Sequence, residues 1–502
     1  MNLSKQNLAN VKAASAQLPP ENVFALPEKI LQFGTGVLLR GLIDDFIDKA
    51  NRKGIFNGRI VVVKSTATGG ADAFATQDGL YTQLIKGIDN GTKVDEVIIN
   101  SSISRVLAAS DEWAEILKVA ASKELKVIIS NTTEVGITLV DDDKVTATPP
   151  KSFPGKLLGV LLKRYETFGG SADSGFVIVP TELVVDNGTK LKGIVKQLAI
   201  NNNLSEAFIN WIDSANDFCN SLVDRIVPGK PAASELKAAE ETLGYTDDLL
   251  IMSECYRLWA IETSSAKSKE TLSFSKADEE GVVIVDDINK FRELKLRLLN
   301  GTHTFSCGLA IVGGFATVKE AMANSTFSTF ITNVSNNEMA PAILNKDINL
   351  ADAQAFAGKV LDRFRNPFIE HLWISISMQY TSKMKLRNVP ILQKYFAANQ
   401  TPPSYMALGF AAYILFMKST KNADGKYIGN LNGKDYTITD DYAAVLSGHW
   451  DGADAASVVN LVLKDVSLWD IDLSGFNGFK DAVTKQLEAL INNGFEAAVK
   501  AL

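Results

Sequence analysis

The feature that most constrains the fold is a strand, a glycine-containing turn, a helix and a second strand in direct succession near the start of the chain. KILQFGTG (29–36) is a short apolar strand that runs into glycines. VLLRGLIDDFIDKANRKG (37–54) has apolar residues at helical spacing and ends at a glycine, and RIVVVKST (59–66) is a β-branched strand. This order is a βαβ unit, which predicts that both strands lie parallel in one sheet.

The same alternation continues to about residue 200. A serine at the expected N-cap and Pro154 in the first turn mark the start of one helix. The predicted elements are strands at 94–103, 125–133 and 174–183 and helices at 111–123 and 152–168. The pattern predicts an α/β domain with a doubly wound parallel sheet, and residues 250–286 add further strands.

From residue 287 onward the apolar period is close to 3.6, which predicts a mainly α-helical domain with a small excursion at 431–442. A chain of 502 residues is too long for one core, so more than one domain is expected. The expected organisation is a polar N-terminal arm at 1–28, an α/β domain at 29–286 and a helical domain at 287–502.

Composition favours small-molecule chemistry. The net charge is −7 and no run of Lys and Arg occurs, which argues against nucleic acid or an anionic membrane as a partner. The polar N-terminus resembles no signal peptide, and no apolar run approaches the ~18–20 residues that span a bilayer. The three cysteines, Cys219, Cys255 and Cys307, show no CxxC spacing. We therefore expect a cytoplasmic protein.

The first glycine turn lies where a dinucleotide fingerprint would be. Gly34 can make the tight turn, Gly36 can admit a pyrophosphate, and the helix N-terminus can bind that anion. The third glycine is replaced by Leu39, and glycines often only make turns, but the strand and helix on either side favour nucleotide binding.

The type of cofactor is open on the residues alone. The second strand ends in Lys64 without the carboxylate that selects the NAD ribose, so Lys64 either favours NADP or is a solvated lysine. In VIISNTTEVGI (127–137), Asn131 and Glu134 follow a strand and can reach a ligand there, or the polar run only caps a turn.

KLRLLNGTH (295–303) is the candidate catalytic segment. In an α-helix, Lys295, Leu299 and His303 share a stripe with Asn300 beside it, which is either a catalytic face or the polar edge of an amphipathic helix. The only other histidines, His371 and His449, suggest no metal cluster. Without a metal, a lysine can exchange an alcohol proton while amide and imidazole groups stabilise the alkoxide. No GxSxG or GxxxxGK[ST] motif occurs.

Three motifs resemble those of the long-chain polyol-specific dehydrogenases typified by mannitol dehydrogenase. FGTGVLLRGL resembles FGxGxFxRxF, SLVDRIVP (221–228) contains VDRIxP, and Lys295, Asn300 and His303 match K-x4-N-x2-H. The resemblance implies an N-terminal Rossmann-type domain, a mainly helical C-terminal domain and an active site between them. It also extends the cofactor-binding role to a set of residues, namely Phe33, Gly34, Gly36, Val37, Arg40, Lys64, Asn131 and Glu134.

Other segments resemble the hexuronate branch of this family. They are ISNTTEVGI (129–137), SFPGKL (152–157), ECYRLWAIE (254–262) and RFRNPFIEHLWISISMQYTSKMKLRNVP (363–390). Mannitol enzymes have an asparagine of the oxyanion hole where TELVVDNG (181–188) has Leu183, as hexuronate enzymes do. The resemblance therefore leaves Asn300, His303 and Lys295 to hold the alkoxide.

The branch implies a reversible, metal-independent and NAD(H)-linked reduction of D-tagaturonate to D-altronate in hexuronate catabolism. Lys295 would be the general acid, and Asn300 and His303 would polarise the carbonyl. A sugar acid needs a cation for its carboxylate. The substrate-binding candidates are Glu182, Arg257, His371, Lys383 and Arg387, and the alternative for each basic residue is a structural salt bridge.

Several alternatives stay open at this point. Within the family, the substrate could be fructuronate or a polyol, and outside it the chain could be a nucleotide-binding sensor that has lost catalysis. The family's usual cofactor favours NAD, and we expect a monomer or a weak homo-oligomer. Gly301 is expected to let substrate or cofactor approach the backbone closely.

Overall fold

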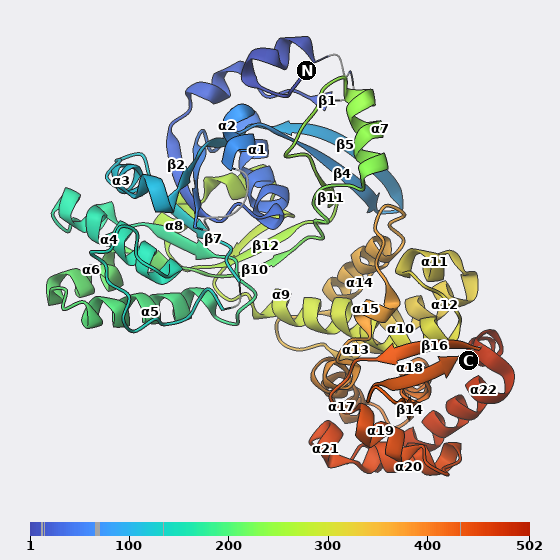
Figure 1. Cartoon of the computed structure of the whole chain (residues 1–502). Coiled ribbons are helices and arrows are strands. Elements are labelled where there is room, and N and C mark those ends of the chain that lie inside the picture. Colours follow the sequence, from blue (N-terminus) through green and yellow to red (C-terminus); the bar gives the residue numbers. More distant parts are fainter. Residues whose placement is uncertain (12–13, 15, 66–70, 134, 432) are drawn as a thin grey trace. The chain divides into compact units, whose positions relative to one another are not determined.

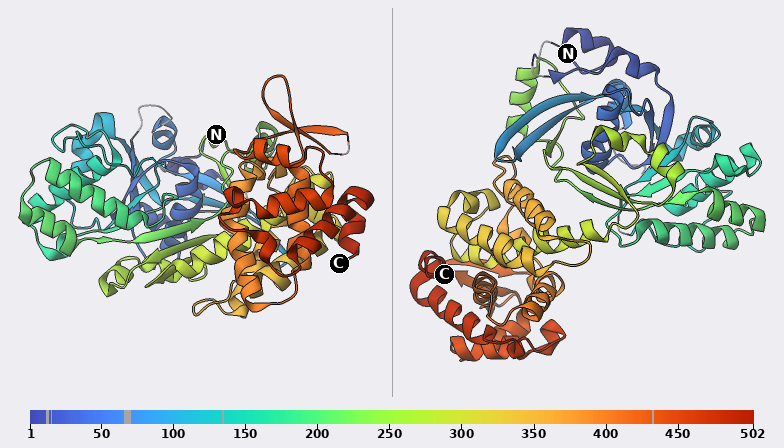
Figure 2. Two further views of the ribbon diagram at one scale, coloured as in Figure 1. Left: turned by 90° about the horizontal axis from the view of Figure 1, so that it is seen from below. Right: turned by 180° about the vertical axis from the view of Figure 1, so that it is seen from behind.

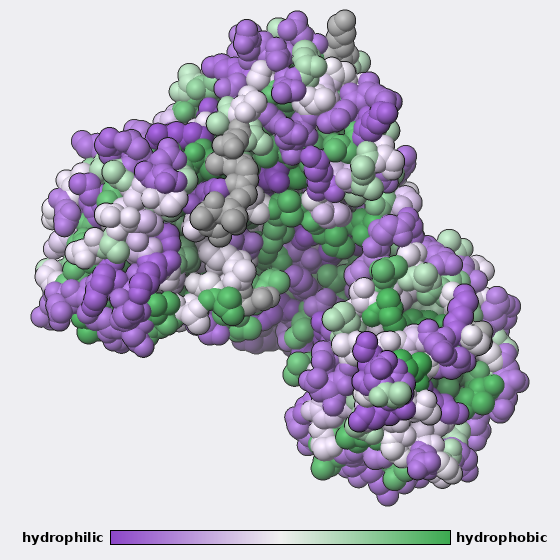
Figure 3. Space-filling model, in the orientation of Figure 1, coloured by the Kyte–Doolittle hydropathy of each residue, from purple (hydrophilic) through white to green (hydrophobic). Residues whose placement is uncertain are grey.

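The computed structural model describes residues 1–11, 14, 16–65, 71–133, 135–431 and 433–502. The chain divides into two compact units (Figure 1). Unit 1 consists of Met1–Gly87 and Lys93–Ile288, and unit 2 consists of Ile88–Thr92 and Asn289–Leu502. Hydrophilic residues cover most of the visible surface of each unit (Figure 3), in keeping with the charge of the chain.

Unit 1 is built on a six-stranded sheet with the order β6-β3-β2-β7-β8-β9, and all its adjacent strands are parallel. Within this sheet, the chain forms the central strand β2 first and then β3 and β6 on one side of it. It then returns to add β7, β8 and β9 on the other side. The bounds are β2 Glu28–Phe33, β3 Arg59–Lys64, β6 Ile103–Ala108, β7 Val127–Ser130, β8 Val177–Pro180 and β9 Asp217–Phe218. This is the doubly wound, Rossmann-type order that the sequence predicted.

Both faces of this sheet are covered, because alternate strand residues point to opposite sides. Ile30 and Ile129 belong to one buried cluster, while Leu31 and Ile128 belong to another. Helices α3, α4, α5 and α6 lie on the second side (Figures 1 and 2). The burial of both faces explains why the strands are continuous apolar runs.

The three helices predicted in unit 1, at 37–54, 111–123 and 152–168, lie close to the predicted positions. Ser152 caps the helix at 153–168, where its hydroxyl accepts a hydrogen bond from Gly155 N at 3.0 Å. The longer helices are α1 Asp44–Arg52, α3 Ala109–Ala120, α4 Phe153–Phe168, α5 Asn187–Asn201, α6 Glu206–Ala215 and α7 Ala233–Leu243. The shorter ones are η1 Lys5–Asn10, η2 Glu21–Ala25, η3 Leu39–Ile43, α2 Ala71–Thr76, η4 Ala172–Ser174, α8 Ala266–Thr271 and η5 Ser273–Ala277.

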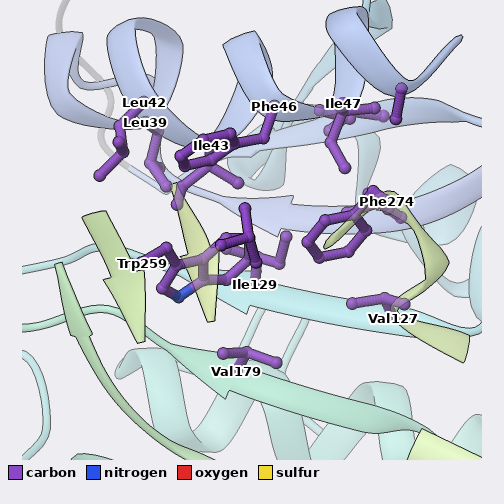
Figure 4. Packing of buried hydrophobic residues seen from close by; sticks show 14 of the residues in the cluster. Leu39, Leu42, Ile43, Phe46, Ile47, Val127, Ile129, Val179, Trp259 and Phe274 are labelled. Carbon is purple, nitrogen blue, oxygen red and sulfur yellow. The ribbon is translucent and has the colours of Figure 1, made fainter. Parts of the chain in front are cut away.

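The first helix, η3 continued by α1, packs on the sheet through its apolar side chains. Leu39, Leu42, Ile43 and Phe46 point from this helix toward the sheet (Figure 4), and the ring of Phe46 stacks on Trp259 at 6.5 Å. Trp259 comes from a three-stranded sheet of β10 Asn220–Asp224, β12 Leu258–Glu262 and β13 Val282–Val285.

The prediction of one strand at 94–103 is wrong, because the segment crosses from one sheet to another. β5 (Thr92–Asn100) belongs to a separate sheet with β1 Ala16–Gln17, β4 Tyr81–Asp89 and β11 Ile251–Glu254, whereas β6 belongs to the six-stranded sheet. Between them, Ser101 donates to Asp48 through both its N–H (2.8 Å) and its hydroxyl (2.9 Å). These buried polar bonds redirect the chain.

The first 28 residues pack against the rest of unit 1. Strand β1 pairs in parallel with β5, and Leu3 is fully buried in an apolar cluster with Leu80 and Tyr245. The segment therefore contributes both a strand and a core residue to this unit.

Unit 2 is mainly helical, as predicted, and two buried helices cross at its centre. In α10 (Gly301–Val312), a Cβ on Gly308 would lie 2.7 Å from the carbonyl oxygen of Ala412, and in α18 (Ser404–Phe416), a Cβ on Gly409 would lie 2.7 Å from that of Phe305. Glycines on both helices thus permit the close crossing. Because α10 also carries His303, this crossing helps to position the candidate site.

The other helices of unit 2 surround this pair. They are α9 Asn289–Leu294, η6 Lys295–Asn300, α11 Val318–Ala323, α12 Ser325–Asn333, η7 Val334–Met339, α13 Ala340–Ala342, α14 Leu350–Phe364, α15 Trp373–Ile376, α16 Tyr380–Lys383, η8 Met384–Asn388, α17 Val389–Ala398, α19 Ala443–His449, α20 Ala455–Lys464, α21 Val466–Trp469, η9 Leu473–Gly475 and α22 Phe479–Lys500. The expected excursion near 431–442 forms a small antiparallel sheet of β14 Thr420–Lys421, β15 Tyr427–Leu431 and β16 Lys434–Ile438.

The arginine of the VDRIVP motif makes a buried ion pair in unit 1. Arg225 Nη1 donates to Asp45 Oδ2 and to Gly41 O, each at 2.6 Å, and Nε donates to Glu254 O at 2.8 Å. Neither side chain of the ion pair is exposed. Burial alone would raise the pKa of Asp45, but the charges of Lys49 and Arg225 outweigh it and lower that pKa.

We predict that Arg225→Met lowers the free energy of unfolding by about 3–5 kcal/mol, because it removes the fully buried partner of the Asp45 carboxylate and leaves only the partly exposed Lys49. Urea unfolding measures the change. The control is Arg105→Met, which removes a partly exposed pair with Glu28 and should cost about 0–1 kcal/mol. Equal losses in the two variants would contradict this interpretation of the motif.

Candidate active site

The glycine turn of unit 1 is held between the ends of two neighbouring strands. Gly34 N donates to Val63 O at 3.1 Å, and Asn131 N donates to Phe33 O at 3.1 Å. Gly34 has a φ of +129°, and a Cβ there would lie 2.9 Å from the carbonyl oxygen of Asn131. The position therefore needs glycine for both its conformation and its close contact.

The next glycine leaves open space beside the backbone. Among the described residues, a Cβ on Gly36 would meet no atom within 4 Å. Arg40 N donates to Gly36 O at 3.3 Å, so the helix begins directly after Gly36. The first N–H groups of this helix have no acceptor within the helix. An accessible backbone at a helix N-terminus is suited to a pyrophosphate, so this part of the chain fits a dinucleotide.

Arg40 lies in the interior of unit 1. Its Nη1 donates to Leu249 O at 2.6 Å, and its guanidinium lies over the rings of Tyr81 and Phe74 at 5.4 and 5.7 Å. Burial lowers its pKa, although Tyr81 and nearby carboxylates act in the opposite direction. These contacts fix the helix beside the turn, and direct contact of Arg40 with a cofactor stays a prediction.

Other predicted cofactor residues lie at or near the turn. The ring of Phe33 is buried against Phe153 at 5.1 Å, and Val37 packs on the apolar cluster beneath the first helix. Lys64 is the last residue of β3 and is partly exposed. Glu134 lies outside the described residues.

The ends of β7 and β8 are joined by side-chain hydrogen bonds. Glu182 is buried and accepts hydrogen bonds from Ser130 Oγ at 3.1 Å and from Thr132 N and Oγ1 at 2.9 and 3.0 Å. Asn131 Nδ2 donates to Thr181 O at 3.1 Å. The Glu182 carboxylate thus organises the loop after β7, and its contact with substrate stays a prediction.

Sequence reasoning gave no role to Asn187, which links β8 to β10. Its Nδ2 donates to Pro180 O, Glu182 O and Ser221 O at 3.0–3.1 Å, and its Oδ1 accepts from Ser221 N at 2.9 Å. The signal for it was its place in an Asp-Asn-Gly turn. Leu183, in the loop before this turn, is 63% exposed.

In unit 2, the candidate catalytic segment is not a regular α-helix. Residues Lys295–Asn300 form the π-helical turn η6, which contains one more residue per turn than an α-helix. The expectation of a regular α-helix is therefore wrong. A π turn places Asn300 nearer to Lys295 around the helix axis than an α turn would, and Leu299 is buried in the core. The segment then continues into α10, which carries His303.

The expectation that Gly301 admits a ligand is also wrong. A Cβ on Gly301 would lie 3.0 Å from Met339 Cε and 3.2 Å from Ile391 Cδ1, so protein side chains fill this space. Asn388 Nδ2 donates to Gly301 O at 3.2 Å. The glycine allows η6, η7 and η8 to pack together beside the candidate catalytic residues.

His303 is buried in an aromatic environment with one ring nitrogen unpaired. Its ring stacks on Phe364 at 4.0 Å and meets His371 and Trp373 edge-on at 5.2 and 6.0 Å. It is 9% exposed, and within the described part of the chain its Nε2 has no hydrogen-bond partner. Burial lowers the pKa of His303 well below its usual value, so the imidazole is neutral at neutral pH.

Four cationic or basic side chains lower the pKa of His303 further, and we call them the cationic group: Arg363, His371, Lys383 and Arg387. Lys383 Nζ donates to Ile376 O at 2.8 Å, and Arg387 Nη1 donates to Thr304 Oγ1 at 3.2 Å. Burial is the largest cause that lowers the pKa of His371, Lys383 and Arg387. The structure thus brings together His303 and three predicted substrate residues.

Sequence reasoning missed Arg363. It is 7% exposed on α14 and follows the buried residues Phe356 and Val360 at helical spacing. The sequence pattern that indicates it is an arginine at helical spacing from apolar residues, because such an arginine lies on the buried face of its helix.

Arg257 belongs to unit 1 and is paired there. Its Nε and Nη2 both donate to the carboxylate of Asp278, the second at 3.0 Å, and Nη1 donates to Cys255 O at 3.3 Å. Because a carboxylate already occupies its donors, Arg257 is a weaker candidate for the substrate carboxylate than the cationic group, and its role stays a prediction.

Two other kinds of feature are absent from the described residues. No cluster of three His, Cys, Asp or Glu side chains is placed to hold a metal ion. In the same part of the chain, no helix is both long enough and apolar enough to cross a membrane.

Comparisons with known proteins agree with the motifs. Residues 28–273 match the mannitol dehydrogenase Rossmann domain, and residues 287–491 match the mannitol dehydrogenase C-terminal domain. The chain is 36% identical over 485 residues to the altronate oxidoreductase of Halalkalibacterium halodurans. The matched region covers 95% of this chain and 93% of that protein.

Two solved structures share the fold. A D-sorbitol dehydrogenase has a TM-score of 0.80 at 20% identity and covers 99% of this chain and 100% of its own. The mannitol 2-dehydrogenase of Pseudomonas fluorescens, in a ternary complex with NAD and D-mannitol, has a TM-score of 0.65 at 23% identity, with coverage of 100% and 99%. As its three sequence motifs predicted, the chain belongs to the mannitol dehydrogenase family.

Proposed function

We propose that this protein is an NAD-dependent altronate oxidoreductase that reduces D-tagaturonate to D-altronate reversibly. The observation that carries the proposal is the 36% identity to an altronate oxidoreductase along 95% of the chain. The cationic group beside an unpaired, buried imidazole supports it, because a sugar acid brings a carboxylate as well as a carbonyl.

The turn after β2 would hold the cofactor. The open backbone at Gly36 and the helix N-terminus suit its pyrophosphate, and we propose further contacts from the predicted set Phe33, Gly34, Val37, Arg40, Lys64, Asn131 and Glu134. NAD, when bound, supplies the hydride acceptor for oxidation, and NADH supplies the hydride for reduction.

Three residues of unit 2 would manage the proton and the developing charge. Lys295 donates a proton to the carbonyl oxygen during reduction and takes it back during oxidation. Asn300 and His303 donate hydrogen bonds to the same oxygen. A neutral His303 keeps one N–H, and its Nε2 has no partner in the described part of the chain, so a substrate oxygen can be its partner.

Lys383 and Arg387 are the proposed partners of the substrate carboxylate, with His371 beside them. Their burial disfavours their charged forms, and an anionic ligand would offset that cost. We add Arg363 as a source of positive potential and retain Glu182 and Arg257 as lesser candidates. This charge favours a sugar acid over a polyol.

We predict that the purified protein oxidises NADH with D-tagaturonate and is much slower with fructuronate and fructose. The assay follows NADH absorbance with the three compounds in parallel, and repeating it with NADPH determines the cofactor preference that Lys64 leaves open. Activity confined to fructose would contradict the proposal, and no turnover with any compound would favour a nucleotide-binding sensor.

We predict that Lys295→Met lowers kcat by about 10²–10⁴-fold, the usual contribution of a general acid. The affinity for NADH should persist, because the glycine turn is unchanged. Stopped-flow turnover and an NADH titration measure the two quantities. Lys290→Met on α9, which removes a contact with Asp352, is the control. A kcat near the wild-type value would exclude Lys295 as the acid.

We predict that Lys383→Met raises KM for tagaturonate by about 10–100-fold, because one charge-assisted bond contributes about 1.5–3 kcal/mol. The KM for fructose, which has no carboxylate, should change much less wherever activity with fructose is high enough to measure it. Lys385→Met on η8, whose ammonium contacts Asp470 at 2.7 Å, is the matched control. Equal effects on both substrates would show that Lys383 does not bind the carboxylate.

A further inference from the structure

Two buried polar side chains lie directly behind the glycine turn. Gln32, near the end of β2, and Asp44, at the start of α1, are both fully buried. Gln32 Nε2 donates to Gly34 O at 3.4 Å and to Asp44 Oδ2 at 3.5 Å. One amide group therefore connects the backbone of the turn to a carboxyl group on the helix that follows it.

This pair is incompletely satisfied. Within the described part of the chain, neither Gln32 Oε1 nor Asp44 Oδ1 has a hydrogen-bond partner. A buried polar atom without a partner reduces the stability of the fold by about 1–3 kcal/mol, so stability alone does not account for this pair. Its contact with Gly34 gives it a different use.

The charged and titratable groups that face Asp44 come from three elements. They are Arg40 on η3, Asp45 on α1 and Tyr81 on β4, and Tyr81 is also influenced by Asp48. Asp45 is paired with Arg225 and Lys49, and Tyr81 donates its hydroxyl to Arg40 O. Arg40 is the nearby cation, but the hydrogen bond shown for its guanidinium goes to Leu249 O. In the described residues, no hydrogen bond joins Asp44 to a cation.

This environment disfavours a charge on Asp44. Burial raises the pKa of Asp44 to about 8, and the hydrogen bond from Gln32 and the charge of Arg40 reduce that effect only in part. Asp44 is therefore mostly neutral at pH 7 and becomes a carboxylate in mildly alkaline solution.

We propose that Gln32 and Asp44 form a positioning pair that holds the Gly34 carbonyl, and with it the phosphate-binding turn, and that binding of the dinucleotide is coupled to a proton on Asp44. This proposal rests on the proposed cofactor. A carboxylate behind the turn and a pyrophosphate in front of it are like charges, so each disfavours the other. By linkage, loss of the proton weakens binding to the same degree that binding opposes loss of the proton.

The direction with pH follows from this linkage. Below about pH 7 Asp44 is protonated in both the free and the bound protein, so the Kd for NADH is constant. As the pH rises through about 8, the free protein loses the proton before the complex does, and Kd increases. One linked proton changes Kd by at most about tenfold per pH unit.

The experiment measures the Kd for NADH by fluorescence titration without substrate, between about pH 7 and about pH 9, in four proteins. Asp44→Asn keeps the shape of the side chain without its charge, and Gln32→Leu removes the bond to Gly34. Glu338→Gln is the control, because burial raises the pKa of this acid of unit 2 to about 7.

We expect the Kd of the wild type and of Glu338→Gln to increase by about threefold to tenfold across this range, as one linked proton allows. We expect Asp44→Asn to show no such increase. Gln32→Leu should bind NADH several-fold more weakly at pH 7, with kcat at saturating NADH close to that of the wild type.

Three outcomes would overturn the proposal. The first is a wild-type Kd for NADH that does not change with pH, which can be observed without any variant. The second is an increase of Kd with pH in Asp44→Asn that equals the increase in the wild type. The third is a Gln32→Leu variant that binds NADH as tightly as the wild type. A failure of the proposed cofactor is distinguishable, because then the wild type would not bind NADH at any pH.

Discussion

The structure of unit 1 depends on a first helix that is buried on nearly all sides while carrying charges. Its apolar side chains pack on the six-stranded sheet, and Asp44, Asp45 and Asp48 are also buried. Each of its inward polar groups needs a partner from elsewhere. Arg225 supplies one for Asp45, the Ser101 hydroxyl supplies one for Asp48, and Gln83 Nε2 donates to Gly41 O at 3.1 Å. The smaller sheets and the VDRIVP motif are therefore tied to the helix that begins at the glycine turn.

Unit 2 meets a related constraint by close packing. Glycines at the crossing of α10 and α18 bring two backbones together, and Gly301 makes room for the side chains of Met339 and Ile391 beside the π-helical turns. His303 is held between aromatic rings in this dense surrounding, with its Nε2 unpaired in the described structure. A dense surrounding keeps the imidazole in one orientation, which is what the proposed role of His303 at the substrate oxygen requires.

Periodicity predicted the fold well where one environment persists along a segment. The strands at 59–64 and 127–130 are buried on both faces, so their apolar runs were clear. The strand at 94–103 was mispredicted because the three polar residues that divide it are buried by partners far away in sequence. Likewise, Asp44 and Asp45 were indistinguishable from the exposed face of an amphipathic helix, since only the tertiary structure shows what covers them.

The π-helical turn at Lys295–Asn300 has a consequence in genetic terms. A π turn spans about the same distance as an α turn with one additional residue, so it corresponds to the insertion of one codon into a regular helix. In a regular α-helix, Asn300 would lie further from Lys295 around the helix axis than it does in the π turn. The placement of the asparagine relative to the lysine thus depends on the number of residues in this segment, and the insertion or deletion of a single residue changes it.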